Sequence, residues 1–128
     1  MHSTLLFTRV AATLGLSTLK PNHIDACAIA VDRDVQVEPR HDEALGMVSL
    51  CVGVARIPAH RAAVTQRAAL AANLRPADLG GAHFALHPGR SELLLCAALE
   101  DPGSDPAPVC AAVARMVALC RHWRAVFA

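Results

Sequence analysis

The sequence predicts an α+β protein in which helices pack against a twisted, mainly antiparallel β-sheet. Residues 47–57 alternate bulky and small side chains with the period of a strand, and residues 82–99 form two apolar runs around a Pro-Gly turn. Three other segments favour helices, two through apolar residues at every third or fourth position and one through its alanine content. The expected order is helix, strand, strand, strand, helix, strand, strand, helix. With 128 residues, the chain is expected to form one domain, residues 1–128.

Composition argues against several classes of protein. Hydrophobic residues make up 54% of the chain and aromatic residues only 3%, so the core is expected to consist of Leu, Val and Ala. The net charge of +1 offers no basic surface for nucleic acid or an anionic membrane. No apolar run reaches the roughly 18 residues of a membrane helix, and Arg9 interrupts the apolar start, which argues against a secretory signal. We therefore expect a cytoplasmic protein that neither binds nucleic acid nor inserts into a membrane.

A first helix is expected near the N-terminus. Ser3 can cap it and Gly15 marks its end. Its helically spaced apolar residues are Leu6, Val10 and Leu14. Because Phe7 widens this apolar face, the face either packs into the core or forms a groove for a partner.

Two strands joined by a tight turn are expected next. The strands are residues 23–31 and 35–38, the turn runs from Asp32 to Asp34, and residues 39–43 form a polar connection.

The strand over residues 47–57 has the clearest pattern in the chain. Its bulky face carries Val48, Leu50, Val52 and Val54. Its small face carries Met47, Ser49, Cys51, Gly53 and Ala55. The bulky face is expected to pack on the helices, and the small face has too little polarity to be fully solvated, so a second layer could approach it closely.

A helix is expected from Pro58 to Leu74, because proline suits the first turn of a helix and Arg75-Pro76 cannot continue one. A hairpin follows Gly80-Gly81, with Pro88-Gly89 at the centre of a type II turn. The apolar face of the hairpin comprises Ala82, Phe84, Leu86, Leu93, Leu95, Ala97 and Leu99.

A last helix is expected after the loop at residues 101–108. Its apolar stripe consists of Val109, Val113, Met116, Cys120, Trp123 and Phe127. Such an unbroken stripe is typical of a helix that docks on a core.

The sequence predicts no catalytic or metal centre. His83 and His87 share a strand face but lie about 13 Å apart, too far to bind one ion. Cys120 and His122 point to different sides of a helix. No phosphate-loop, dinucleotide or nucleophile-elbow motif occurs, so no catalytic residue, metal ligand or cofactor is expected.

The five cysteines, at positions 27, 51, 96, 110 and 120, form neither a C-x-x-C pair nor an even framework. They are expected to be reduced, apolar fillers, and Cys51 and Cys96 in particular lie inside predicted strands. The alternative is a small cytosolic ligand-binding or thiol-dependent enzyme domain, which one unusually reactive thiol would support.

The helix over residues 58–74 is apolar on more than one side, since Val64 and Leu70 do not share a narrow stripe. In a monomer this helix could simply cover its own sheet. A second copy of the chain would also cover it, because two-fold symmetric dimers are the commonest oligomers.

The ordered set of segments resembles the class I type III secretion chaperones, the CesT/Tir-chaperone-like family. The resemblance is carried by LGL at 14–16, LGMVSLCVGVARIP at 45–58, ALAANL at 69–74, GGAHFALHPGRSELLLCAAL at 80–99 and the last helix with Trp123. It implies a homodimer without enzymatic activity in the bacterial cytoplasm. Such a dimer holds the N-terminal chaperone-binding region of a secreted effector in extended form, soluble and competent for secretion, as part of virulence.

The resemblance also implies where the partners bind. The dimer interface would comprise Val64, Ala68, Leu70, Ala71, Leu74, Ala82 and Phe84. The effector would contact Leu5, Leu6, Val10, Leu14, Ile24, Ala26, Ile29, Val35 and Val37, in part by strand addition at a sheet edge. The secretion-system ATPase is a further partner that the resemblance allows.

Overall fold

The computed structural model describes residues 2–14, 17–18, 29–30 and 34–128. Within this part of the chain, six strands form one antiparallel sheet in the order β1-β2-β3-β4-β6-β5. The helices are α1 (His2–Leu14), α2 (Ala62–Ala72) and α3 (Ala107–Val126), with 3-10 turns at Ala59–Arg61 and Pro76–Leu79. The strands are β1 (Ser17–Thr18), β2 (Ile29–Ala30), β3 (Gln36–Asp42), β4 (Met47–Arg56), β5 (His83–His87) and β6 (Glu92–Glu100). The predicted α+β class is confirmed.

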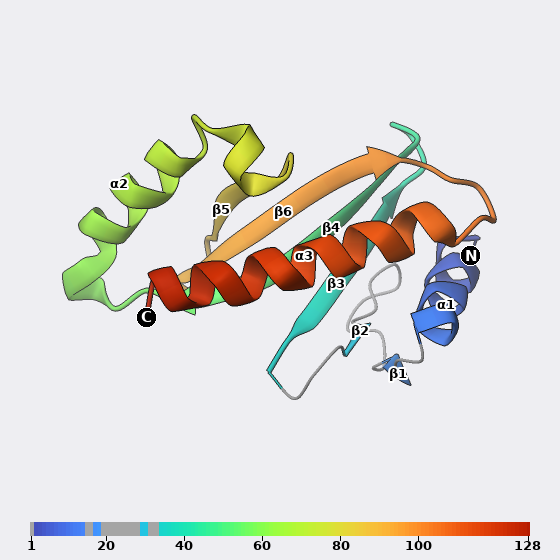
Figure 1. Ribbon diagram of the computed structural model, residues 1–128, viewed down its shortest axis with the longest axis horizontal. Helices are drawn as coiled ribbons and strands as arrows, with labels where there is room; N and C mark the ends of the chain where they lie inside the picture. The colour runs from blue at the N-terminus through green and yellow to red at the C-terminus, as the bar shows by residue number, and fades with distance from the viewer. Residues whose placement is uncertain (1, 15–16, 19–28, 31–33) are drawn as a thin grey trace.

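The helices divide between one face and one end of the sheet (Figure 1). Helix α3 crosses the sheet over β4 and β6, and α1 packs beside it against β3. Helix α2 lies beyond the β5 edge and contributes a single buried residue, Ala69. One helix therefore remains largely outside the core that the other two cover.

The core forms under α3, on the bulky face of β4. Val48, Leu50 and Val52 are at most 1% exposed, and across the ladder Val52 pairs with Leu95, which is also buried. Burying a side chain of this size stabilises the fold by about 1.5–3 kcal/mol. The predicted inward face of this strand is confirmed.

The predicted stripe of α3 meets this core. Four of its members, Val109, Val113, Met116 and Cys120, are buried. Near the C-terminal end, Phe84 of β5 packs edge-to-face with Trp123 and Phe127, with ring centroids 5.1 and 5.6 Å apart. Such edge-to-face pairs add about 0.5–1.5 kcal/mol beyond the burial of their area.

Asn73, immediately after α2, ties this helix to the edge strand. Its side-chain Nδ2 donates to the Phe84 carbonyl at 3.2 Å, and the Phe84 N–H donates to its Oδ1 at 2.7 Å. One side chain therefore occupies both outward backbone groups of Phe84. The helix thus attaches to β5 through hydrogen bonds more than through buried apolar area.

The polar connection expected at residues 39–43 is wrong, because β3 continues through Asp42 and pairs with β4 as far as Met47. Proline lacks an N–H, but none is required at Pro39. Among the described residues, β2 pairs with β3 only at Gln36 and Val37, so no neighbouring strand accepts a hydrogen bond from position 39 on that side of β3. The true turn comprises residues 43–46, where Gly46 has φ +61°.

The predicted type II turn at Pro88-Gly89 is also wrong. Arg90 N donates to the His87 carbonyl at 3.4 Å, as expected for a turn centred on Pro88-Gly89. However, Gly89 lacks the positive φ of a type II turn, and Ser91 instead adopts φ +47°. The ladder closes at His87 and Glu92, so the loop comprises residues 88–91, two more than a two-residue turn, and Ser91 adopts the left-handed conformation.

Near the N-terminus, α1 begins at His2, so Ser3 lies inside the helix and not at its cap. The sequence did not predict the short strand β1. Of the strand expected over residues 23–31, Ile29–Ala30 forms β2, while residues 23–28 and 31 lie outside the described residues. Gly15 and two residues of the expected turn, Asp32 and Arg33, also lie outside them.

Candidate functional site

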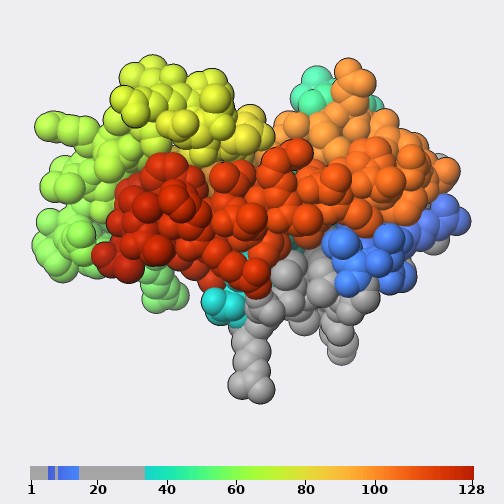
Figure 2. Space-filling model, viewed as in Figure 1, coloured from blue at the N-terminus to red at the C-terminus, as the bar shows by residue number. Residues whose placement is uncertain are grey.

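Helix α2 presents a broad apolar surface to solvent, which we call the α2 face. It comprises Val64, Ala68, Leu70 and Ala71 of the helix, and Leu74 of the turn that follows it. The three large members are 70%, 67% and 83% exposed, in the order Val64, Leu70, Leu74. Ala69, which faces the sheet, lies on the opposite side of the helix. Figure 2 shows α2 forming one end of the molecule, next to the C-terminal end of α3.

The α2 face contains five of the seven residues expected at a dimer interface. The other two, Ala82 and Phe84, are only 4% and 5% exposed in the single chain. Both side chains point inward, and the Phe84 ring packs against the rings of Trp123 and Phe127 of the C-terminal segment. Sequence alternation located their face correctly but could not show that the chain's own helix covers it.

The residues expected to contact an effector are mostly buried where the structure describes their side chains. Four of them, Leu6, Val10, Val35 and Val37, are at most 4% exposed. Helix α1, which carries Leu6 and Val10, packs against α3 and against β3, which carries Val37. Leu14 is half-buried against the same core. Leu5 lies in α1 and Ile29 in β2, whereas Ile24 and Ala26 lie outside the described residues.

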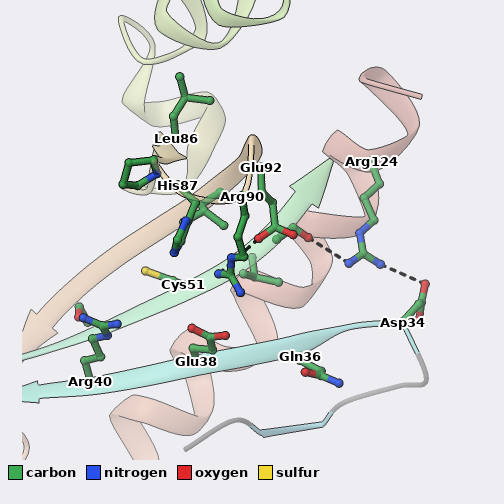
Figure 3. A pocket seen from close by; sticks show the side chains of 15 residues that line it. Asp34, Gln36, Glu38, Arg40, Cys51, Leu86, His87, Arg90, Glu92 and Arg124 are labelled. Carbon is green, nitrogen blue, oxygen red and sulfur yellow. Dashed lines mark hydrogen bonds and ion pairs between the residues drawn. The ribbon is translucent and has the colours of Figure 1, made fainter. Parts of the chain in front are cut away.

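The small face of β4 lines a cavity of about 580 Å³, which we call the groove (Figure 3). Glu38 and Arg40 reach it from β3, Cys51 from β4, and Arg90 and Glu92 from the β5–β6 hairpin. Charged groups of both signs thus surround a strand face that is itself small and uncharged. Such a surface suits polar backbone or mixed side chains better than a purely apolar ligand.

Ion pairs organise one end of the groove. Arg124, from the last turn of α3, donates to Asp34 Oδ2 at 3.1 Å and to the Gly53 carbonyl at 3.0 Å. Arg90 and Glu92 approach within 3.6 Å. A Cβ on Gly53 would lie 3.0 Å from Glu92 Oε2, so the glycine makes room for this carboxylate. The sequence signal for this cluster was weak because its members come from four separate elements.

Two cysteines meet on the same face. Cys51 and Cys96 are directly opposed in the β4–β6 ladder, and their Sγ atoms lie 3.1 Å apart. The hydrogen bond from the Cys96 thiol lowers the pKa of Cys51 to about 7, with a smaller contribution from Arg40, against the effects of burial and Glu38. The same contact raises the pKa of Cys96. This lowered pKa sets Cys51 apart from the inert apolar filler that the sequence predicts there.

The other described cysteines behave as expected. Burial raises the pKa of both Cys110 and Cys120, which line the core under α3. Among the described residues, no group of three or more His, Cys, Asp or Glu side chains could hold a metal ion. No helix in this part of the chain is long and apolar enough to cross a membrane.

Residues 6–124 match the model of the Tir chaperone protein (CesT) family. The chain belongs to this family. The match includes most of α1, the whole sheet and all but the last residues of α3, so the family assignment covers both the α2 face and the groove. None of the curated proteins matches the chain.

Three solved structures share the fold of this family member. A chain of the HopA1–SchA chaperone–effector complex superposes with a TM-score of 0.70 at 17% identity, covering 97% of each chain. A chain of the ExsC–ExsE complex gives 0.73 at 16% identity, covering 93% of this chain and 88% of that one. The Yersinia pestis type III secretion chaperone SycH, in complex with a stable fragment of YscM2, gives 0.65 at 17% identity, covering 96% and 99%.

Proposed function

We propose that this protein is a homodimeric, non-enzymatic chaperone of type III secretion that holds an extended segment of an effector protein in the bacterial cytoplasm. The observation that carries the proposal is the family match over residues 6–124. The shared fold with chains from chaperone–effector complexes supports it. Secretion requires an unfolded or extended substrate segment, and a chaperone of this kind stabilises it by binding alone.

The α2 face supports the dimer. Exposed apolar side chains of this size are unusual when they cluster on one helix of a small domain. A second copy related by two-fold symmetry would place the same face against itself. We assign the interface to Val64, Ala68, Leu70, Ala71 and Leu74, while Ala82 and Phe84 support it from inside the fold.

For the effector, we keep the N-terminal region of the chain as the proposed contact. The buried residues Leu6, Val10, Val35 and Val37 shape this region from the core. Leu5, Leu14, Ile24, Ala26 and Ile29 are proposed to contact the effector directly. An extended effector segment would gain affinity from main-chain hydrogen bonds and specificity from alternate side chains in pockets.

A catalytic use of the Cys51 thiol is the alternative function, and the geometry favours it less. Nucleophilic cysteines are activated by a base that a third group orients. The strongest influence on Cys51 is another thiol, Cys96. We therefore do not assign a catalytic reaction to the groove.

Co-expression tests the proposed function. The chain is expressed with the tagged N-terminal segment of a secreted protein encoded nearby, and with the remainder of that protein as the matched control. We expect capture of the chaperone by the N-terminal segment alone and a dimer mass by light scattering. A monomer at micromolar concentration that neither segment captures would refute the proposal.

A further inference from the structure

The Cys51–Cys96 pair has the backbone geometry of a cross-strand bridge. Residues directly opposed in an antiparallel ladder have Cα atoms about 4.5 or 5.5 Å apart, depending on the type of pair. Both spacings fall within the 4.4–6.8 Å that a disulfide requires. The two Sγ atoms already point toward one another at 3.1 Å. The bridge therefore needs rotation of side chains and no rearrangement of β4 or β6.

Reagents can reach this pair. Both residues are only half-buried, and Cys51 lines the groove (Figure 3). Cys110 and Cys120, by contrast, are 9% and 0% exposed on the covered side of the sheet. Access alone therefore separates the pair from the other two described cysteines.

The two thiols are also chemically unequal. Cys51 has the lowered pKa and Cys96 the raised one. The reason is that the Cys96 thiol keeps its proton and donates it in a hydrogen bond to the Cys51 thiolate. Thiolates and not thiols attack disulfides, and an attacking thiol with a pKa near the ambient pH reacts fastest. Cys51 is thus the nucleophile of the pair and Cys96 the group that completes the bridge.

We propose that Cys51 and Cys96 form an oxidation site in the groove, which a small disulfide of the glutathione type converts into a bridge between β4 and β6. The Cys51 thiolate attacks one sulfur of glutathione disulfide, forming a mixed disulfide and releasing one glutathione thiolate, which takes up a proton. Cys96 then loses its proton and attacks Cys51 Sγ, releasing the second glutathione. Two protein thiols are oxidised and one glutathione disulfide is reduced to two glutathione molecules.

This bridge would change the groove itself. It removes a group that is partly anionic near neutral pH and replaces it with an uncharged, apolar disulfide between Arg40 and Glu38 on one side and β5 on the other. The site lies on the sheet face away from α3 and apart from the α2 face. Neither the proposed dimer contact nor the proposed effector contact includes Cys51 or Cys96, so the proposal does not rest on either of them.

The test uses the purified full-length chain, fully reduced and then incubated with glutathione disulfide at neutral pH. After an acid quench and denaturation, we expect the free thiol count to fall from five to three, and non-reducing peptide mapping to join Cys51 to Cys96. Retention of all five thiols, or a bridge between any other pair, would overturn the proposal.

Single variants separate the two roles. Cys96→Ser is expected to accumulate one glutathione on Cys51, because no second thiol resolves the mixed disulfide. Cys51→Ser is expected to stay unmodified at Cys96 over the same time, and Cys120→Ser, the matched control, should bridge like the wild type. Equal labelling of Cys51→Ser and Cys96→Ser would contradict the assigned nucleophile. If a variant fails to fold, the wild-type map still decides the proposal, and no readout depends on effector binding.

Discussion

Replacement of Leu70 by aspartate should dissociate the proposed dimer. Leu70 is 67% exposed in the single chain and is one of the three large apolar residues of the α2 face. Fully burying a leucine contributes about 1.5–3 kcal/mol, so burial of its exposed part should contribute about 1–2 kcal/mol per copy. Two-fold symmetry presents the residue twice, which gives about 2–4 kcal/mol for the dimer.

This energy converts into a measurable change. Because 1.4 kcal/mol is tenfold in affinity, the dimer Kd should rise about 30- to 700-fold. The carboxylate adds a desolvation cost wherever the contact still forms, so the range is a lower bound. The fold should be unaffected, since Leu70 contributes little to the monomer core.

Sedimentation equilibrium over a dilution series that spans the wild-type midpoint measures the Kd directly. The matched control is Leu45→Asp, because Leu45 is 73% exposed but lies in the β3–β4 turn, at the other end of the molecule from α2 (Figure 1). Circular dichroism should show both variants folded. An unchanged Kd for Leu70→Asp, or an equal rise for Leu45→Asp, would show that the α2 face is not the interface.

Three further outcomes are expected. Leu95→Ala should lower the free energy of unfolding by about 2–5 kcal/mol in urea titrations, because it empties a fully buried site; a loss under 1 kcal/mol would contradict the assigned core. Asn73→Ala should lower the free energy of unfolding by about 1–3 kcal/mol and speed amide hydrogen exchange in β5, since the N–H and C=O of Phe84 lose their hydrogen-bond partner. Unchanged exchange in β5 would count against this contact. Alkylation of Cys51 should rise with pH through a midpoint near 7, as the thiolate forms, and Cys96→Ala, which removes the thiol that donates to Cys51, should move the midpoint upward; a midpoint at the ordinary value for cysteine would argue against this hydrogen bond.

The elements with a strict local period were predictable from the sequence. The inward face of β4 and the stripe of α3 follow from side-chain direction alone, which the backbone period fixes. Residues 39–43 were not predictable in this way, because they alternate little and contain a proline. Their strand conformation comes from pairing with β4, a partner that local sequence does not reveal.

The candidate site was harder to predict, because it also depends on contacts between segments that are far apart in the sequence. An apolar stripe shows that a face needs cover, but not whether the cover is the chain's own helix or another molecule. Val10 and Val37 proved to be covered by α1, α3 and the sheet, whereas Leu70 stayed open. The Cys51–Cys96 contact depends on the register of β4 against β6, so neither cysteine could show it alone.

Asn73 has a consequence for how copies of this protein can associate. An exposed edge strand normally offers its backbone as a template, and sheets can then add to one another without limit. Here the amide group of Asn73 already satisfies the N–H and C=O of Phe84, so an incoming strand would have to displace it. Strand addition to β5 at Phe84 is thereby hindered, which leaves the apolar residues of α2 as the surface for the proposed dimer, and a two-fold contact of that kind is complete after two copies.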